Sequence, residues 1–182
     1  MRVVPCMAAV LLALIAMQAR ADDPVPLVGY GDVALGEPVG ELRQTHSIVK
    51  ICCQGGSTIY VDAERQHIAG KEFTVTYLVE GGTVRLIALR ADYLTGDMAR
   101  CMGGLDTLAE LLARKYGKFD GRPEMTTDHP GVVGLKAIKS WSDRRLDVRA
   151  DYDPKAGLDC VLFASYRFND AVLLLSDDAS KL

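Results

Sequence analysis

The sequence predicts an α+β fold, a two-layer sandwich in which one long and one short helix pack on one face of an antiparallel sheet. Three observations support this prediction. Residues 96–117 have the spacing of an amphipathic helix. Short strands with alternating apolar and polar residues lie on both sides of it. Two helices are too few to cover both faces of a large sheet.

The first 21 residues have the pattern of a secretory signal peptide. A short basic start precedes the apolar run Val3–Met17, and Ala19-Arg20-Ala21 supplies a small-x-small cleavage pattern. The run is shorter than the roughly 20 residues that a bilayer span needs, so we expect no membrane span after cleavage. We expect a periplasmic or secreted protein in which 22–182 form a single α+β domain and 22–31 form an extended lead-in.

The charge balance narrows the choice of partners. The whole chain has a net charge of −3, and loss of two signal-peptide arginines leaves 19 basic against 24 acidic side chains. This balance gives no indication of nucleic-acid binding. No cysteine stands immediately after the cleavage pattern, so no lipid anchor is expected, and no motif indicates a cofactor.

Four cysteines remain in the mature chain, and an even number in an exported protein favours disulfides: Cys52, Cys53, Cys101 and Cys160. A bridge between Cys52 and Cys53 is disfavoured because neighbouring Cα atoms are only about 3.8 Å apart. Both remaining pairings join Cys101 to Cys52 or Cys53 and leave Cys160 to the other. A single bridge with two free thiols is the alternative.

The long helix should bury one stripe of side chains, which recur at steps of three and four: Cys101, Leu105, Leu108, Leu112 and Tyr116. Gly117 fits a C-terminal cap. Asp97 could cap the whole stretch, or Asp106 could cap a shorter helix after Gly103-Gly104. Either the helix breaks at the two glycines, or Gly104 lets it lie close to a neighbour.

A short helix at 36–46, with Pro38 at its first helical position, precedes the first strands. Strands are predicted at 47–53, 58–61, 72–79 and 84–88. The third should place Phe73, Val75, Tyr77 and Val79 on one face, and Gly81-Gly82 should form a hairpin turn to the fourth.

After the long helix, 120–131 should be loop, since it contains Pro123 and Pro130. Strands are predicted at 133–141, 145–152, 160–168 and 171–175. In the second of these, Leu146, Val148, Ala150 and Tyr152 should face inward and Arg145, Asp147, Arg149 and Asp151 outward. The two halves of the chain share an order of helix and then meander, which could reflect a degenerate repeat.

This order, with Leu112-Ala-Arg-Lys-Tyr-Gly117 closing a helix before the Trp141 strand and a meander, resembles small exported bacterial α/β domains. Examples are the β-lactamase-inhibitor-like proteins and the small outer-membrane assembly lipoproteins. The resemblance covers most of the mature chain by element order, without a family signature. It implies a binding or assembly role without catalysis.

No catalytic motif is present. Gly55-Gly56-Ser57 lacks the serine between glycines of a nucleophile elbow and reads as a turn. The chain has three histidines, His46, His67 and His129. None of them has a second metal ligand or catalytic partner at helical or hairpin spacing. A small hydrolase-like enzyme using His129 or His67 with a nearby aspartate remains an alternative.

Metal binding has simpler competing explanations. Cys52 and Cys53 could bind Cu(I) as adjacent thiolates, which defines a thiol- or metal-handling alternative, but disulfide formation is the simpler reading. Several aspartates do not have the spacing of a calcium loop and suit turns or surface positions: Asp151, Asp153, Asp159, Asp177 and Asp178.

Two other features bear on binding. Arginines along the second meander are interleaved with aspartates and indicate a solvated strand face, with an acidic partner as the alternative: Arg144, Arg145, Arg149 and Arg167. Trp141 is expected to anchor the core. We therefore expect a non-enzymatic domain that binds another envelope or extracellular protein, as an inhibitor, an immunity protein or an envelope accessory factor.

Overall fold

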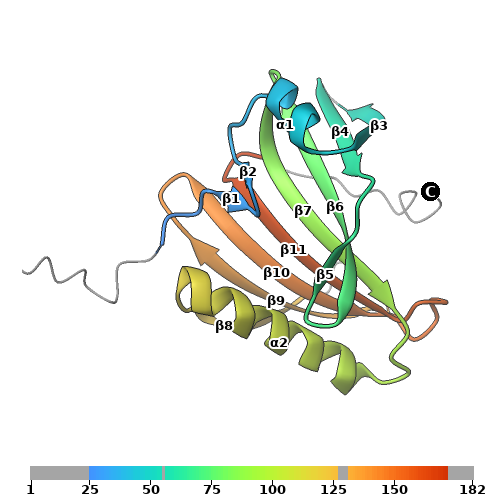
Figure 1. Cartoon of the computed structure of the whole chain (residues 1–182). Helices are drawn as coiled ribbons and strands as arrows, with labels where there is room; N and C mark the ends of the chain where they lie inside the picture. Colours follow the sequence, from blue (N-terminus) through green and yellow to red (C-terminus); the bar gives the residue numbers. More distant parts are fainter. Residues whose placement is uncertain (1–24, 55, 127–130, 172–182) are drawn as a thin grey trace, which may run out of the picture.

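The computed structural model describes residues 25–171, except residue 55 and residues 127–130. This part of the chain contains antiparallel sheets and two helices (Figure 1), which confirms the α+β class. None of its helices has the length and apolar character needed to cross a bilayer.

The first half of the chain contains a short helix followed by a meander. Its elements are β1 (Gly29–Tyr30), β2 (Val33–Ala34), α1 (Val39–Thr45), β3 (Ile48–Gln54), β4 (Ser57–Asp62), β5 (Gln66–Ile68), β6 (Lys71–Glu80) and β7 (Thr83–Tyr93). The second half repeats this order with a longer helix. Its elements are α2 (Met98–Tyr116), β8 (Asp120–Thr126), β9 (Val133–Ser140), β10 (Arg144–Tyr152) and β11 (Cys160–Phe168).

The sheet order explains how the two halves join. The main sheet runs β3-β4-β6-β7-β11-β10-β9-β8, with β5 paired to β6, and every pairing is antiparallel. The last strands of the two meanders, β7 and β11, therefore meet in the middle, and the first strands, β3 and β8, form the two edges. The order of helix and meander seen in the sequence thus corresponds to a symmetric arrangement of strands.

The long helix is continuous across its two glycines. Asp97 is the N-cap, and its side chain accepts a hydrogen bond from the Ala99 amide at 2.9 Å. Gly117 follows with φ +82°, the left-handed region in which glycine is favoured. All five stripe residues are buried, including Leu108 and Leu112, as predicted.

The helix contacts β10, β11 and β9, the strands of its own half. Its first turn lies over the start of β11, and Cys101 forms a disulfide with Cys160, with the Cα atoms 5.6 Å apart. The predicted bridges from Cys101 to Cys52 or Cys53 are therefore wrong. The stripe does face the sheet, but β3 is the far edge, and its two cysteines are free and exposed.

The core contains side chains from both helices and from the face of the sheet that α2 covers. Leu42 of α1 and Leu105 of α2 are fully buried in the same apolar cluster. The inward faces predicted for β6 and β10 are confirmed at these side chains, which are all buried: Phe73, Val75, Tyr77, Val79, Leu146, Val148 and Ala150. Tyr152, also predicted to face inward, is partly buried against the same cluster. Trp141 is partly buried and packs edge-to-face on Tyr116, with the ring centroids 6.2 Å apart.

Residues 120–126 form strand β8 rather than the predicted loop. The strand pairs only with β9, and the register shifts between Asp120 and Glu124. An edge strand with an irregular register tolerates Pro123, which cannot donate to a ladder. Smaller differences occur in the first half. Pro38 is the N-cap of α1 rather than its first residue. The sequence predicts neither the three-residue strand β5 nor the short pair β1 and β2. The predicted strand 171–175 lies outside the described residues except for Ala171.

Candidate functional site

The two edges of the sheet have opposite character. Edge strand β8 has Pro123 and three charged residues, Asp120, Arg122 and Glu124, features that discourage pairing with another strand. Edge strand β3 has no proline and a single charge, Lys50. Its outer side pairs with no other strand of the described chain.

Strand β3 exposes apolar side chains in addition to unpaired backbone. Val49 is 59% exposed and Ile51 is 41% exposed. Both β-branched residues favour extended backbone, so the strand is well suited to pairing. An exposed apolar edge can accept a strand from a second molecule, through main-chain hydrogen bonds and alternate side-chain contacts. The edge strand β3 is therefore our candidate protein-binding site.

A β-bulge determines which way the β3 side chains point. Lys50 lies opposite Tyr60 and Cys52 lies opposite Ile59, so Ile51 is the extra residue. Cys53 then lies opposite Thr58, with Sγ 4.0 Å from the Thr58 Oγ1. Consecutive residues of a strand point to opposite faces, so the two thiols cannot approach a single metal ion without a change in the backbone.

The thiols themselves are accessible. Cys52 and Cys53 are both free and exposed. A side-chain hydrogen bond from Lys50, and a second with Thr58, lower the pKa of the Cys53 thiol. A lowered pKa increases the thiolate fraction, which is the nucleophilic and metal-binding form. No group of three or more metal-binding side chains occurs in the described parts of the chain.

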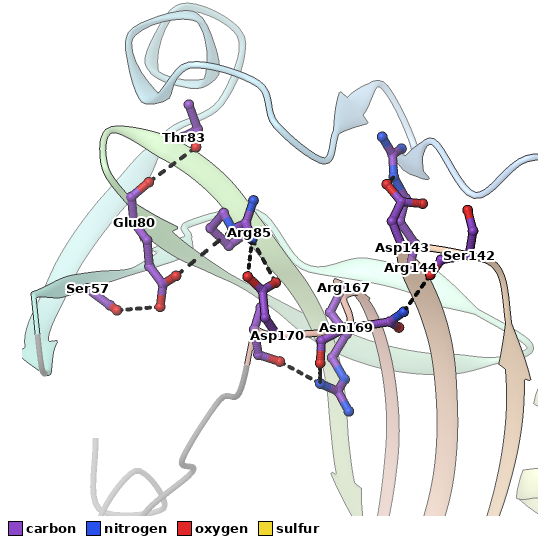
Figure 2. A network of polar contacts seen from close by, with 11 residues as sticks. Ser57, Glu80, Thr83, Arg85, Ser142, Asp143, Arg144, Arg167, Asn169 and Asp170 are labelled. Carbon is purple, nitrogen blue, oxygen red and sulfur yellow. Dashed lines mark hydrogen bonds and ion pairs between the residues drawn. The ribbon is translucent and has the colours of Figure 1, made fainter.

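A chain of polar contacts fixes the neighbour of β3 to the rest of the sheet (Figure 2). The Ser57 hydroxyl on β4 donates to Glu80 Oε1 at 2.7 Å, and Glu80 Oε2 lies 4.0 Å from Arg85 Nε. Arg85 Nη2 donates to both carboxylate oxygens of Asp170, at 2.7 and 2.8 Å. The first residue of β4 is thereby connected to β6, β7 and the segment after β11, which supports the β3–β4 hairpin.

The arginines of the second meander are paired with aspartates of the same face. Asp147 is only 8% exposed, and it accepts hydrogen bonds from both Arg145 and Arg167. The prediction of an exposed, solvated face is therefore wrong for Asp147, which these two arginines cover. Arg149 pairs with Asp151 at 2.6 Å. Arg145, Arg149 and Asp151 are partly buried rather than exposed as predicted.

Arg144 lies apart from this face. Its Nη1 donates to the Leu27 carbonyl at 2.8 Å and so holds the lead-in segment. The four arginines therefore do not form the open basic surface that an acidic partner would need.

The histidines do not assemble into a site. His46 has Nδ1 2.8 Å from Asp62 and Nε2 3.2 Å from Asp32, so both ring nitrogens have carboxylate partners. His67 is 74% exposed and lies 3.6 Å from Glu72, and His129 lies outside the described residues. Neither the cavity beside α2 and β5 nor the one at the lead-in segment is lined by a histidine of the described chain.

The aspartates considered for calcium have separate structural roles. The Asp159 carboxylate accepts the backbone amides of Thr95 and Gly96, both at 2.6 Å. Asp153 accepts the backbone amide of Lys155 at 2.9 Å. Asp177 and Asp178 lie outside the described residues.

No family model, curated protein or solved structure matches the chain. The sequence did not single out Val49 and Ile51 as binding residues, although a run without alternation between faces, Ile48-Val-Lys-Ile51, was a sign that its apolar side chains could not all be buried.

Proposed function

We propose that the chain is an exported, non-catalytic domain that binds another envelope or extracellular protein, by accepting a strand at edge strand β3. The observation that carries the proposal is the exposure of Val49 and Ile51 on a strand whose outer side pairs with nothing in the described chain. The contrast with edge strand β8 supports the proposal. Charges and a proline discourage pairing at β8, whereas β3 has no proline and a single charge.

The proposal treats the molecule as a two-layer sandwich with both helices in one layer. The shared burial of Leu42 and Leu105 supports this arrangement. This arrangement is compatible with an inhibitor, an immunity protein or an envelope accessory factor. It is also compatible with the resemblance to β-lactamase-inhibitor-like and outer-membrane assembly domains.

Capture from a periplasmic extract or culture supernatant tests the proposal. Ile51→Lys places a second charge on the edge, and Leu111→Lys is its matched control, because Leu111 is 43% exposed on α2 and Ile51 is 41% exposed on β3. We expect wild type and Leu111→Lys to retain the same protein and Ile51→Lys to lose it. Equal retention by both variants would exclude the β3 edge as the binding site. Urea unfolding within about 0.5 kcal/mol of wild type establishes that both variants fold.

A second candidate function is thiol chemistry, favoured by the free, exposed Cys53 with its lowered pKa. The Cys53 thiolate would attack a disulfide, forming one mixed disulfide and releasing the other half as a thiolate. Incubation with oxidised glutathione should then give a single adduct that Cys53→Ser abolishes and Cys52→Ser retains. Adduct formation of the same extent in both variants would exclude a specific role for Cys53.

A further inference from the structure

A cavity lies between α2, the β5–β6 hairpin and the end of β7. Its volume is about 400 Å³, within the range of roughly 300–1,000 Å³ of small-molecule sites. Its apolar walls come from the sheet and from the helix, with Ile68, Phe73 and Leu162 on strands and Leu108 on α2. In Figure 1 the β5 hairpin reaches toward the helix at this place.

Two glycines of α2, Gly103 and Gly104, line the cavity and leave this part of its helical side without side chains. A Cβ at Gly104 would lie 2.6 Å from Tyr93 Oη, so packing requires a glycine there. A Cβ at Gly103 would meet nothing within 4 Å. Glycine inside a helix is disfavoured relative to alanine. Packing therefore does not require Gly103, and its effect is to leave the cavity open.

The hairpin wall also carries an uncommon conformation. Ala69 has φ +51° and is followed by Gly70 at φ +73°. Both positive values suit a two-residue hairpin turn, whose first position usually holds asparagine, aspartate or glycine. Ala69 adopts this costly conformation while it lines the cavity, where it contributes a small apolar surface.

The charged side chains that line the cavity are both positive. Lys71 and Arg100 line it, and no described lining residue is an aspartate or a glutamate. The Lys71 ammonium lies 3.7 Å from the centroid of the Tyr93 ring, a cation–π contact that holds it beside the cavity. The Arg100 side chain is 77% exposed, with Nε 4.0 Å from Asp97. The lining itself therefore carries two cations and no anion, while Asp97 and Asp159, which accepts the Thr95 amide, lie next to it.

We propose that the cavity binds a small carboxylic acid with an apolar body. The carboxylate would lie between Lys71 and Arg100, which supply charge-assisted hydrogen bonds. The apolar body would contact Phe73, Leu108 and Leu162. The site is separate from edge strand β3, so the inference does not depend on the proposed function.

Calorimetric titration with octanoate tests the proposal, with 1-octanol as the neutral counterpart. We expect saturable binding of octanoate with a Kd below about 1 mM, and binding of 1-octanol that is at least about tenfold weaker. Gly103→Leu should fill the cavity and weaken octanoate binding by at least about tenfold. Arg100→Gln should weaken it severalfold, whereas Arg114→Gln, on the same helix outside the cavity, should leave it unchanged.

The cavity variants should fold as wild type does. Gly103→Leu meets open space and replaces glycine by a better helix former, so its unfolding midpoint should not fall. If Gly103→Leu nevertheless unfolds, the exposed pair Arg100→Gln and Arg114→Gln decides the outcome. The proposal is overturned if wild type shows no saturable octanoate binding, if 1-octanol binds equally well, or if the variants that fold bind octanoate as wild type does.

Discussion

Gly104 of α2 lies against the hydroxyl of Tyr93 on β7, so that a Cβ at position 104 would be 2.6 Å from the Tyr93 Oη. The same Cβ would also lie 3.1 and 3.3 Å from the two terminal methyl groups of Leu162. The helix can therefore lie this close to the sheet because position 104 has no side chain. Gly104 is part of the packing, and the glycine pair does not break the helix.

Gly104→Ala should destabilise the protein by about 1–3 kcal/mol, because the added methyl group must displace Tyr93 and Leu162. Gly103→Ala is the matched control, with nothing within 4 Å, and should stabilise by up to about 1 kcal/mol through helix propensity. Urea unfolding of the two variants measures both effects. Equal effects at the two positions would contradict the close approach of Gly104 to the sheet.

Replacing Cys101 and Cys160 together with alanine should cost about 4 kcal/mol, since the bridge closes a loop with a sequence separation of 59. The double variant Cys52→Ser with Cys53→Ser should change stability by less than about 0.5 kcal/mol, because both side chains are exposed. Chemical denaturation with and without reductant measures the difference. Non-reducing peptide mapping that recovers Cys101 attached to Cys52 or Cys53 would contradict the structure.

Asp147→Ala should destabilise by about 2–3 kcal/mol, because it leaves Arg145 and Arg167 partly buried without their common carboxylate. Asp143→Ala is the comparison, since Asp143 pairs with Arg144 while its side chain is 62% exposed, and should cost about 0–1 kcal/mol. The measurement is the free energy of unfolding in urea. If Asp147→Ala lowers the free energy of unfolding by less than about 0.5 kcal/mol, the face is solvated, as the sequence predicts, and the arginines do not cover Asp147.

The Cys53 thiol should react with iodoacetamide at lower pH than an ordinary thiol. Its pKa is lowered first by Lys50 and then by Thr58, so more thiolate is present at any pH below the usual value. In the Cys52→Ser variant, the midpoint of the alkylation rate against pH should lie below that of an ordinary exposed cysteine in a peptide, and Lys50→Gln should raise it. A midpoint at or above that of the peptide cysteine in the Lys50-containing protein would contradict the assigned hydrogen bond.

Local patterns predicted the elements whose two faces differ in polarity. The stripe from Cys101 to Tyr116 and the alternation in β6 and β10 are periodic, so their buried faces followed directly. Strand β8 was missed because all but one of its residues are exposed, and it contains glycine and proline. An edge strand pairs with only one neighbouring strand, so its sequence is less constrained and predicts the strand only weakly.

Contacts between distant segments could not be read from the chain. The choice of Cys160 over Cys52 or Cys53 depends on which half of the sheet α2 covers, and the stripe on the helix is the same in either case. Asp147 alternates outward as predicted, but its burial depends on Arg167, which lies 20 residues later on the neighbouring strand. The cavity residues Lys71 and Arg100 likewise meet only in the folded protein.

Hydrogen exchange of the β3 backbone amides, residues 48–53, tests the central claim most directly. The exchange is measured with and without the protein that wild type captures and Ile51→Lys does not, and edge strand β8 serves as the internal control. Strand addition predicts strong slowing of exchange at β3 and none at β8, because partner carbonyls accept the outward-facing amides of β3. Unchanged exchange at β3 in the saturated complex, or slowing confined to other elements, would contradict the account.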